Sequence, residues 1–174
     1  MDTLLYIASC VAVASTLMVI TRKNAVHALL YLIVSLLSVA VIFFLLGAPF
    51  VAALEVIIYA GAIMVLFVFV IMMLNMGQDR VQQEVQWISP AGWVGPACLA
   101  AVLFGELWYA ITESSAKGVE GISEVTPKMV GQSLFGPYLI GAELASFLLL
   151  SALVGAYYLG RRADREKMQR GDPS

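Results

Sequence analysis

The chain has 174 residues, of which 61% are hydrophobic and 13% are charged. Soluble domains have about 45–50% apolar and about 25% charged residues, so the composition excludes a soluble globular enzyme. With a mean hydropathy of +0.89, it indicates an integral membrane protein. The formal net charge is −2 and no dense basic cluster occurs, which excludes a nucleic-acid partner.

Residues that could carry electrons are scarce. The only histidine is His27, and the two cysteines, Cys10 and Cys98, lie inside apolar runs without a C-x-x-C spacing. Iron–sulfur clusters are held by several cysteines, and a bis-histidine haem needs two histidines. We therefore expect no metal site, no cofactor site and no redox centre in this chain alone.

Five apolar segments are long enough to cross about 30 Å of hydrocarbon. Their uninterrupted hydrophobicity predicts α-helices, because a membrane β-strand would alternate apolar and polar residues. We predict an all-α domain over residues 1–160 and a basic cytoplasmic tail over 161–174. The five predicted transmembrane helices cover about 4–20, 26–46, 51–74, 92–111 and 138–159.

The loop charges predict the orientation of these helices. Arg22, Lys23, Arg80 and the basic residues of the tail all fall on one side if the N-terminus lies outside and the C-terminus inside. Eight of the ten basic residues are then cytoplasmic, as the positive-inside rule requires. In the outer loop, Thr126 and Pro127 are typical of a helix start and predict a short surface helix.

Three carboxylates lie within the predicted spans, at Glu55, Glu106 and Glu143, with no lysine or arginine among them. Acids inside a membrane are costly and are often functional. The predicted topology places all three in the outer third of the bilayer. We interpret Glu55 and Glu143 as candidate proton-path or water-ordering groups, with hydrogen bonding to a neighbouring helix near the headgroups as the alternative. Glu106 adjoins two aromatic residues, which favours an interfacial position for it.

The third span combines an acid with a weak point in the helix. Tyr59 lies one turn after Glu55, so the two can share a face and hydrogen-bond, or the ring can simply pack. Gly61 stands between Ala60 and Ala62, where a helix can approach a neighbour closely or can bulge. We predict a π-type irregularity between about Tyr59 and Val65, and close helix packing remains the alternative.

One stretch is specific enough to indicate a family. The segment 24–75, and most specifically its part "ALEVIIYAGAIMVLFVFVIMMLN" (residues 53–75), closely resembles the J-type (chain 6) membrane subunit of proton-pumping NADH:quinone oxidoreductase, respiratory complex I. The resemblance extends more weakly to "LFGPYLIGAELASFLLL", residues 134–150, and leaves out the C-terminal tail. The sequence departs from the family at Ala25, where relatives often have proline. This difference concerns the first turn of the second predicted helix.

The resemblance implies a small helical subunit in the membrane arm of a bacterial inner-membrane enzyme, less readily a mitochondrial one. It implies a π-bulge in the third helix at Tyr59, Ala60, Gly61 and Ala62, whose rotation would link quinone chemistry to proton translocation. Partners would be the other complex I subunits and the lipid bilayer. NADH, FMN, iron–sulfur clusters and quinone would be bound by those other subunits.

The leading hypothesis is therefore a non-redox coupling subunit of a redox-driven proton pump. Two alternatives are an autonomous small ion transporter or antiporter component and a purely structural helix scaffold. The lack of a basic residue inside the spans, and of a visible inverted repeat, disfavours the transporter. The grouping of Glu55, Tyr59 and Gly61 on one span disfavours the scaffold.

Overall fold

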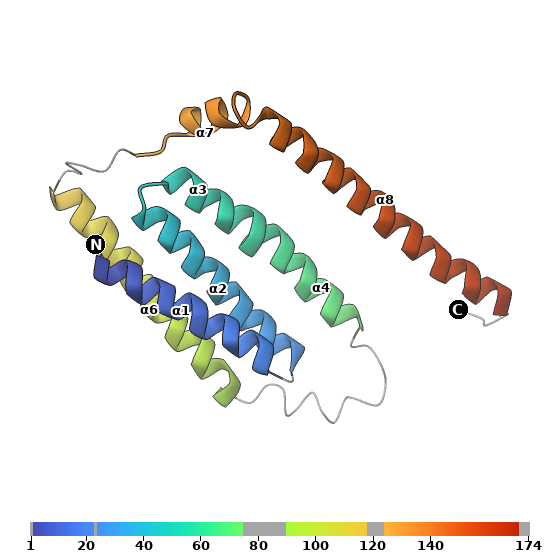
Figure 1. Ribbon diagram of the computed structural model, residues 1–174. Coiled ribbons are helices and arrows are strands. Elements are labelled where there is room, and N and C mark those ends of the chain that lie inside the picture. The colour runs from blue at the N-terminus through green and yellow to red at the C-terminus, as the bar shows by residue number, and fades with distance from the viewer. Residues whose placement is uncertain (1, 23, 75–89, 118–123, 171–174) are drawn as a thin grey trace. The chain divides into compact units, whose positions relative to one another are not determined.

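The structure is a computed structural model that describes residues 2–22, 24–74, 90–117 and 124–170 (Figure 1). Every regular element in these ranges is a helix, and none is a strand. The chain forms two compact units, Met1–Thr126 and Pro127–Ser174, and each is described by itself. The all-α architecture predicted from the sequence is confirmed for the described residues.

The helices follow the predicted hydrophobic segments closely. Five of the helical stretches are long and apolar enough to cross a membrane, which confirms the predicted number of spans. In chain order the elements are α1 (Asp2–Thr21), α2 (Ala25–Leu45), α3 (Pro49–Leu54), the π-helical η1 (Glu55–Ile63), α4 (Met64–Leu74), α6 (Pro90–Lys117), α7 (Pro127–Leu134) and α8 (Leu139–Arg170).

Helices α1 and α2 form a hairpin whose turn is defined by Asn24. The backbone of Asn24 is extended, and its side-chain oxygen accepts a hydrogen bond from the backbone N–H of Val26 at 2.9 Å. This is the usual N-cap arrangement, so α2 begins normally with Ala25 at the first position instead of proline. Across the same turn, Arg22 lies over the ring of Tyr31 and donates to its hydroxyl oxygen at 3.4 Å.

The turn between α2 and α3 depends on a glycine. Gly47 has a φ of 81°, a left-handed conformation that L side chains rarely adopt. Its N–H donates to the carbonyl oxygen of Phe44 at 3.0 Å, and Pro49 then starts α3, where a missing N–H costs nothing. The Gly47 carbonyl oxygen accepts from the N–H of Val125 at 2.8 Å, which joins Val125 to this turn.

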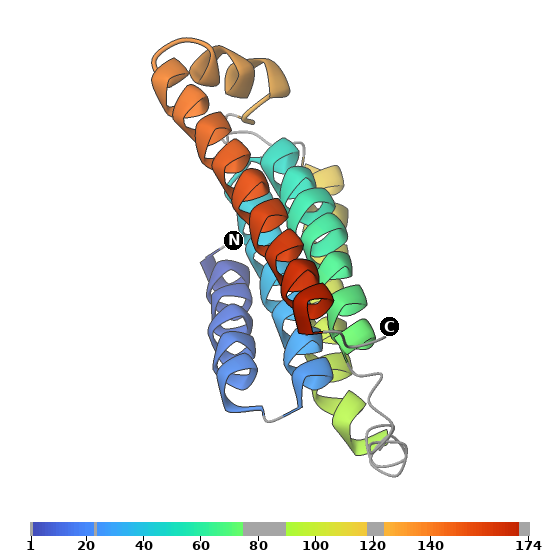
Figure 2. The ribbon, with the colours of Figure 1, turned by 90° about the vertical axis from the view of Figure 1, so that its right-hand side faces the viewer.

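Helix α2 is the centre of the first unit. It contacts α1, α6 and all three parts of the third span, α3, η1 and α4, and both ribbon views show it between α1 and the third span (Figures 1 and 2). The buried core lies where α1, α2 and α6 meet. Its members are Ala8, Val11, Val34, Val41, Leu45, Leu103 and Ala110.

The second unit consists of the short helix α7 and the long helix α8. The predicted surface helix is present as Pro127–Leu134. Helix α8 starts one residue after the predicted start at residue 138 but continues to Arg170, past the predicted end of the span at residue 159. Its apolar residues, including Leu148 and Leu149, are exposed within this chain, as expected for a span that meets lipid or other proteins.

Candidate functional site in the third span

The third span is not a regular α-helix. Between α3 and α4, the nine residues of η1 are π-helical, and the backbone N–H of Met64 donates to the carbonyl oxygen of Tyr59, five residues back. In an α-helix, the same N–H would donate to the carbonyl oxygen four residues back. The predicted π-type irregularity is confirmed, although it begins earlier, at Glu55, and ends at Ile63. Four of the five predicted hinge residues lie within η1, whereas Val65 lies in α4.

Gly61 fits closely against the π-helical backbone. A Cβ at this position would lie 3.2 Å from the carbonyl oxygen of Val56, five residues back. That separation is tighter than an ordinary van der Waals contact, so a side chain here would press on the π-helical turn itself. The close neighbour belongs to the same segment and not to another helix.

Glu55 and Tyr59 both belong to η1, so the structure brings these two predicted site residues onto one segment. Glu55 is partly exposed and Tyr59 is 48% exposed within this chain. No hydrogen bond joins them among the described residues. Their polar atoms are therefore open to groups outside this chain, such as water, lipid headgroups or another subunit.

Glu143 lies near the start of α8 in the second unit, where its side chain is exposed. Since the two units are described separately, the structure places Glu143 only on its own helix. It shares with Glu55 an open position within an apolar span.

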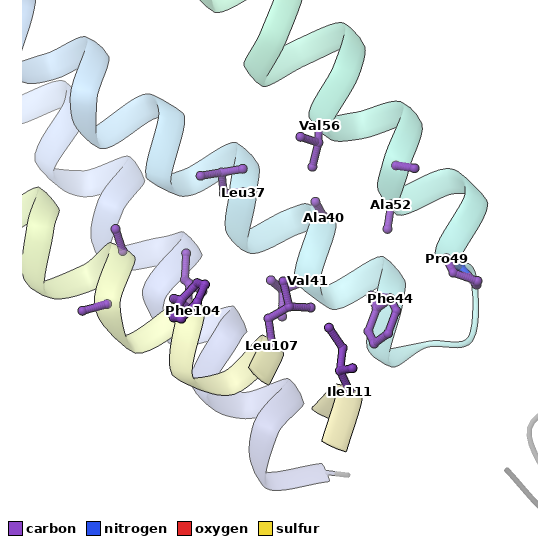
Figure 3. Close-up of a pocket in the computed structure, with 14 residues that line it drawn as sticks. Leu37, Ala40, Val41, Phe44, Pro49, Ala52, Val56, Phe104, Leu107 and Ile111 are labelled. Atoms are coloured by element: carbon purple, nitrogen blue, oxygen red, sulfur yellow. The ribbon is translucent and has the colours of Figure 1, made fainter. Parts of the chain in front are cut away.

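An apolar groove lies beside the third span, between α2, the α3–η1 segment and α6 (Figure 3). Its volume is about 770 Å³. A site for a polar cofactor has a few placed polar groups, whereas every side chain that lines this groove is apolar. The lining residues are Leu37, Ala40, Val41, Phe44, Pro49, Ala52, Ala53, Val56, Ala100, Ala101, Leu103, Phe104, Leu107 and Ile111.

Glu106 differs from the other two acids of the spans because its side chain is buried. Its side chain is only 6% exposed within the first unit, although the neighbouring Trp108 and Tyr109 are exposed. The interfacial depth expected for Glu106 stays a prediction. Leu103, Glu106 and Ala110 follow one helical face, and the other two residues are in the core. That spacing is the sequence signal that could have identified its burial.

The described residues offer little for redox chemistry. They contain no group of three or more His, Cys, Asp or Glu side chains that could hold a metal ion. Cys10 and Cys98 are free thiols on exposed positions. The polar groups that the site offers are the carboxyl groups of Glu55 and Glu143 and the hydroxyl of Tyr59.

Comparison with known proteins identifies the family. A family model described as NADH-ubiquinone/plastoquinone oxidoreductase chain 6 matches residues 15–159. A protein of Pseudomonas aeruginosa named NADH-quinone oxidoreductase subunit J is 57% identical over 162 residues, covering 93% of this chain and 98% of the relative. The subunit J of Escherichia coli K12 is 51% identical over 176 residues, covering 100% and 95%.

Proposed function

The chain belongs to the NADH-ubiquinone/plastoquinone oxidoreductase chain 6 family, and from this premise we propose that it is a non-redox coupling subunit whose third helix switches between π and α forms. In this proposal the chain helps to couple quinone reduction to proton translocation. The observation that carries it is the π-helical segment η1 in the middle of an otherwise apolar span.

A π-to-α transition would have a defined mechanical effect. A π-bulge adds one residue to a helix, so its loss turns everything beyond it by about 100° and shifts it by about 1.5 Å. The part that would turn is α4, Met64–Leu74. Met64 is buried in the present form, whereas its neighbours Val65 and Leu66 are exposed. Rotation would therefore exchange the side chains that α4 presents to α2 and to its other neighbours.

The acidic end of η1 supplies the link to protons. Glu55 begins the π segment, so a change in its hydrogen bonding acts directly on the first turn of that segment. Because the carboxylate is open on the surface of this chain, water or a partner subunit can reach it. We propose that Glu55, with Tyr59, orders water or relays protons beside the switching helix, and that Glu143 does so on α8.

The rest of the enzyme supplies what this chain lacks. We propose that its partners are the other subunits of an NADH-quinone oxidoreductase, as its relatives' names imply, and that it resides in a bacterial inner membrane with its N-terminus outside. NADH, FMN, iron–sulfur clusters and quinone would then be bound elsewhere in the complex. The exposed apolar faces of the third span and α8 supply surfaces for these partners and for lipid.

The proposal is tested by Gly61→Val in the assembled enzyme. A β-branched side chain near the Val56 carbonyl oxygen should disfavour the π form by about 1–3 kcal/mol. We expect NADH oxidation and assembly to persist while the number of protons translocated per NADH falls. The measurement is proton uptake and NADH oxidation in the same inverted membrane vesicles.

A matched control is Gly105→Val in α6, because no atom outside its own stretch of helix backbone lies within 4 Å of a Cβ built there. This variant makes the same chemical change in a regular helix and should leave coupling intact. Normal proton translocation by an assembled Gly61→Val enzyme would contradict the switching mechanism. The third span would then be a packing element, and the chain a scaffold of the complex.

A further inference from the structure

Glu106 stands apart from the acids of the proposed coupling site because it is enclosed by this chain alone. It is 6% exposed, and neither carboxyl oxygen has a hydrogen-bond partner among the described residues. A buried polar group without a partner is uncommon, and in a native protein it calls for a specific explanation.

The surroundings of Glu106 are known from the helices that meet there. It lies on α6 between Leu103 and Ala110, and both of these belong to the core that α6 forms with α1 and α2. The core residues that α1 contributes are Ala8 and Val11. The carboxyl group is therefore held in a mainly aliphatic three-helix interface, on a face of α6 that the side chains of α1 and α2 cover.

No cation in the described part of the first unit faces this interface. Arg22 contacts Tyr31 at the turn between α1 and α2, and His27 lies in the first turn of α2 after it. The titratable side chains of α1 nearest its start, Asp2 and Tyr6, are exposed. A carboxylate anion would thus have no partner, and burying an unpaired charge costs far more than burying a neutral acid.

A neighbouring subunit cannot supply the missing partner without displacing these helices. Both carboxyl oxygens are inaccessible within this single chain, so a lysine or arginine of another protein has no path to them. The one ligand that always reaches such a group is a proton. We infer that Glu106 is a proton-binding site of this chain, at which a neutral carboxylic acid is enclosed by α1, α2 and α6.

The other unpartnered buried group does not need this explanation. Ser15 also has a buried hydroxyl with no partner among the described residues. A serine on a helix can turn its hydroxyl toward the carbonyl oxygen four residues back, as Ser9 and Ser38 do at 2.7 and 2.8 Å. An ionised carboxylate has no hydrogen to donate in that way, whereas a protonated one does.

The test is infrared absorption of the assembled complex in the region of the protonated carboxyl C=O stretch. The wild type is compared with Glu106→Gln at neutral pH, and Asp2→Asn is the matched control because Asp2 is an exposed carboxyl on α1. We expect Glu106→Gln to lose the absorption of one protonated carboxyl per complex, with the deuterium shift that identifies such a group. Asp2→Asn should lose none of it.

A second variant separates protonation from folding. Glu106→Leu should assemble at the wild-type level, because it replaces a neutral, unpartnered acid by an apolar side chain of similar volume. If the Glu106→Gln spectrum retains every protonated-carboxyl band, or if Glu106→Leu abolishes assembly, Glu106 is an anion with a water or cationic partner and the inference is wrong.

Discussion

The interface of α1, α2 and α6 differs from the third span in how much of its apolar surface the chain itself covers. Leu103 of α6 is 4% exposed, whereas Leu66 of α4 is 62% exposed. Both helices are apolar enough to cross the membrane, so hydrophobicity does not distinguish them. The difference indicates that the three-helix interface forms the internal core of the first unit, while much of the third span stays exposed on the surface of this chain.

Replacing one leucine by alanine in each region tests this difference most directly. Leu103→Ala should cost about 2–5 kcal/mol, because it leaves a cavity among packed helices. Leu66→Ala should cost close to nothing within this chain, since the side chain is exposed. Thermal inactivation of the membrane-bound complex measures both. A larger loss for Leu66→Ala would mean that contacts with other subunits contribute more than the internal core.

A second prediction concerns the fit between α2 and α6. A Cβ at Gly95 would overlap the hydroxyl oxygen of Tyr31, which is buried and therefore has little room to move. Gly95→Ala should cost about 1–3 kcal/mol and reduce the amount of assembled complex on native gels. Adding Tyr31→Phe should restore assembly, because it removes the overlapping atom. No restoration would show that removing the hydroxyl oxygen is not enough, since the ring carbon Cζ lies 3.2 Å from the same Cβ position, whereas Gly105→Ala should be harmless throughout.

A third prediction addresses the polar contact between α1 and α2. The hydroxyl oxygens of Thr16 and Ser35 are 2.9 Å apart. Hydrogen bonds between membrane helices average about 0.6 kcal/mol, so the coupling energy between Thr16→Val and Ser35→Ala should be of this order. A double-mutant cycle on thermal inactivation measures it. Strictly additive effects would mean that this contact aligns the hairpin without stabilising it.

The smallest effect on stability is expected at Glu55. Glu55→Gln keeps the size of a partly exposed side chain and should leave assembly unchanged. If the carboxylate relays protons beside η1, quinone-linked proton uptake should nevertheless fall several-fold. The control is Asp2→Asn, the same change at an exposed acid in the first turn of α1. Unchanged uptake in Glu55→Gln would assign this acid a purely structural role.

Much of the fold could be predicted because membrane spans depend on local composition. A run of about 20 apolar residues has few ways to satisfy its backbone in lipid other than a helix, so the five spans were predicted from length and hydropathy. The π segment was also predicted in the right span, from Gly61 between two alanines together with the family resemblance. Its start at Glu55 was missed, because no residue type by itself sets where a π turn begins.

The burial of Glu106 could not be read from hydropathy. Lipid and protein neighbours are equally apolar, so the residues of a membrane helix carry little information about which face packs against which. The aromatic residues beside Glu106 predicted a depth in the bilayer, and depth does not specify whether a side chain packs against other helices. Trp108 and Tyr109 are exposed, whereas Glu106 is buried.

The sequence by itself determined that this protein is a five-span helical membrane protein of the chain 6 family with an irregular third helix. Only the tertiary structure decided which surfaces are internal. The enclosure of Glu106, the contact of Tyr31 with Gly95 and the groove beside the third span all depend on the way α6 packs against α1 and α2. The physical reason is that spanning a bilayer depends on the composition of one segment, whereas packing depends on the shapes of several segments at once.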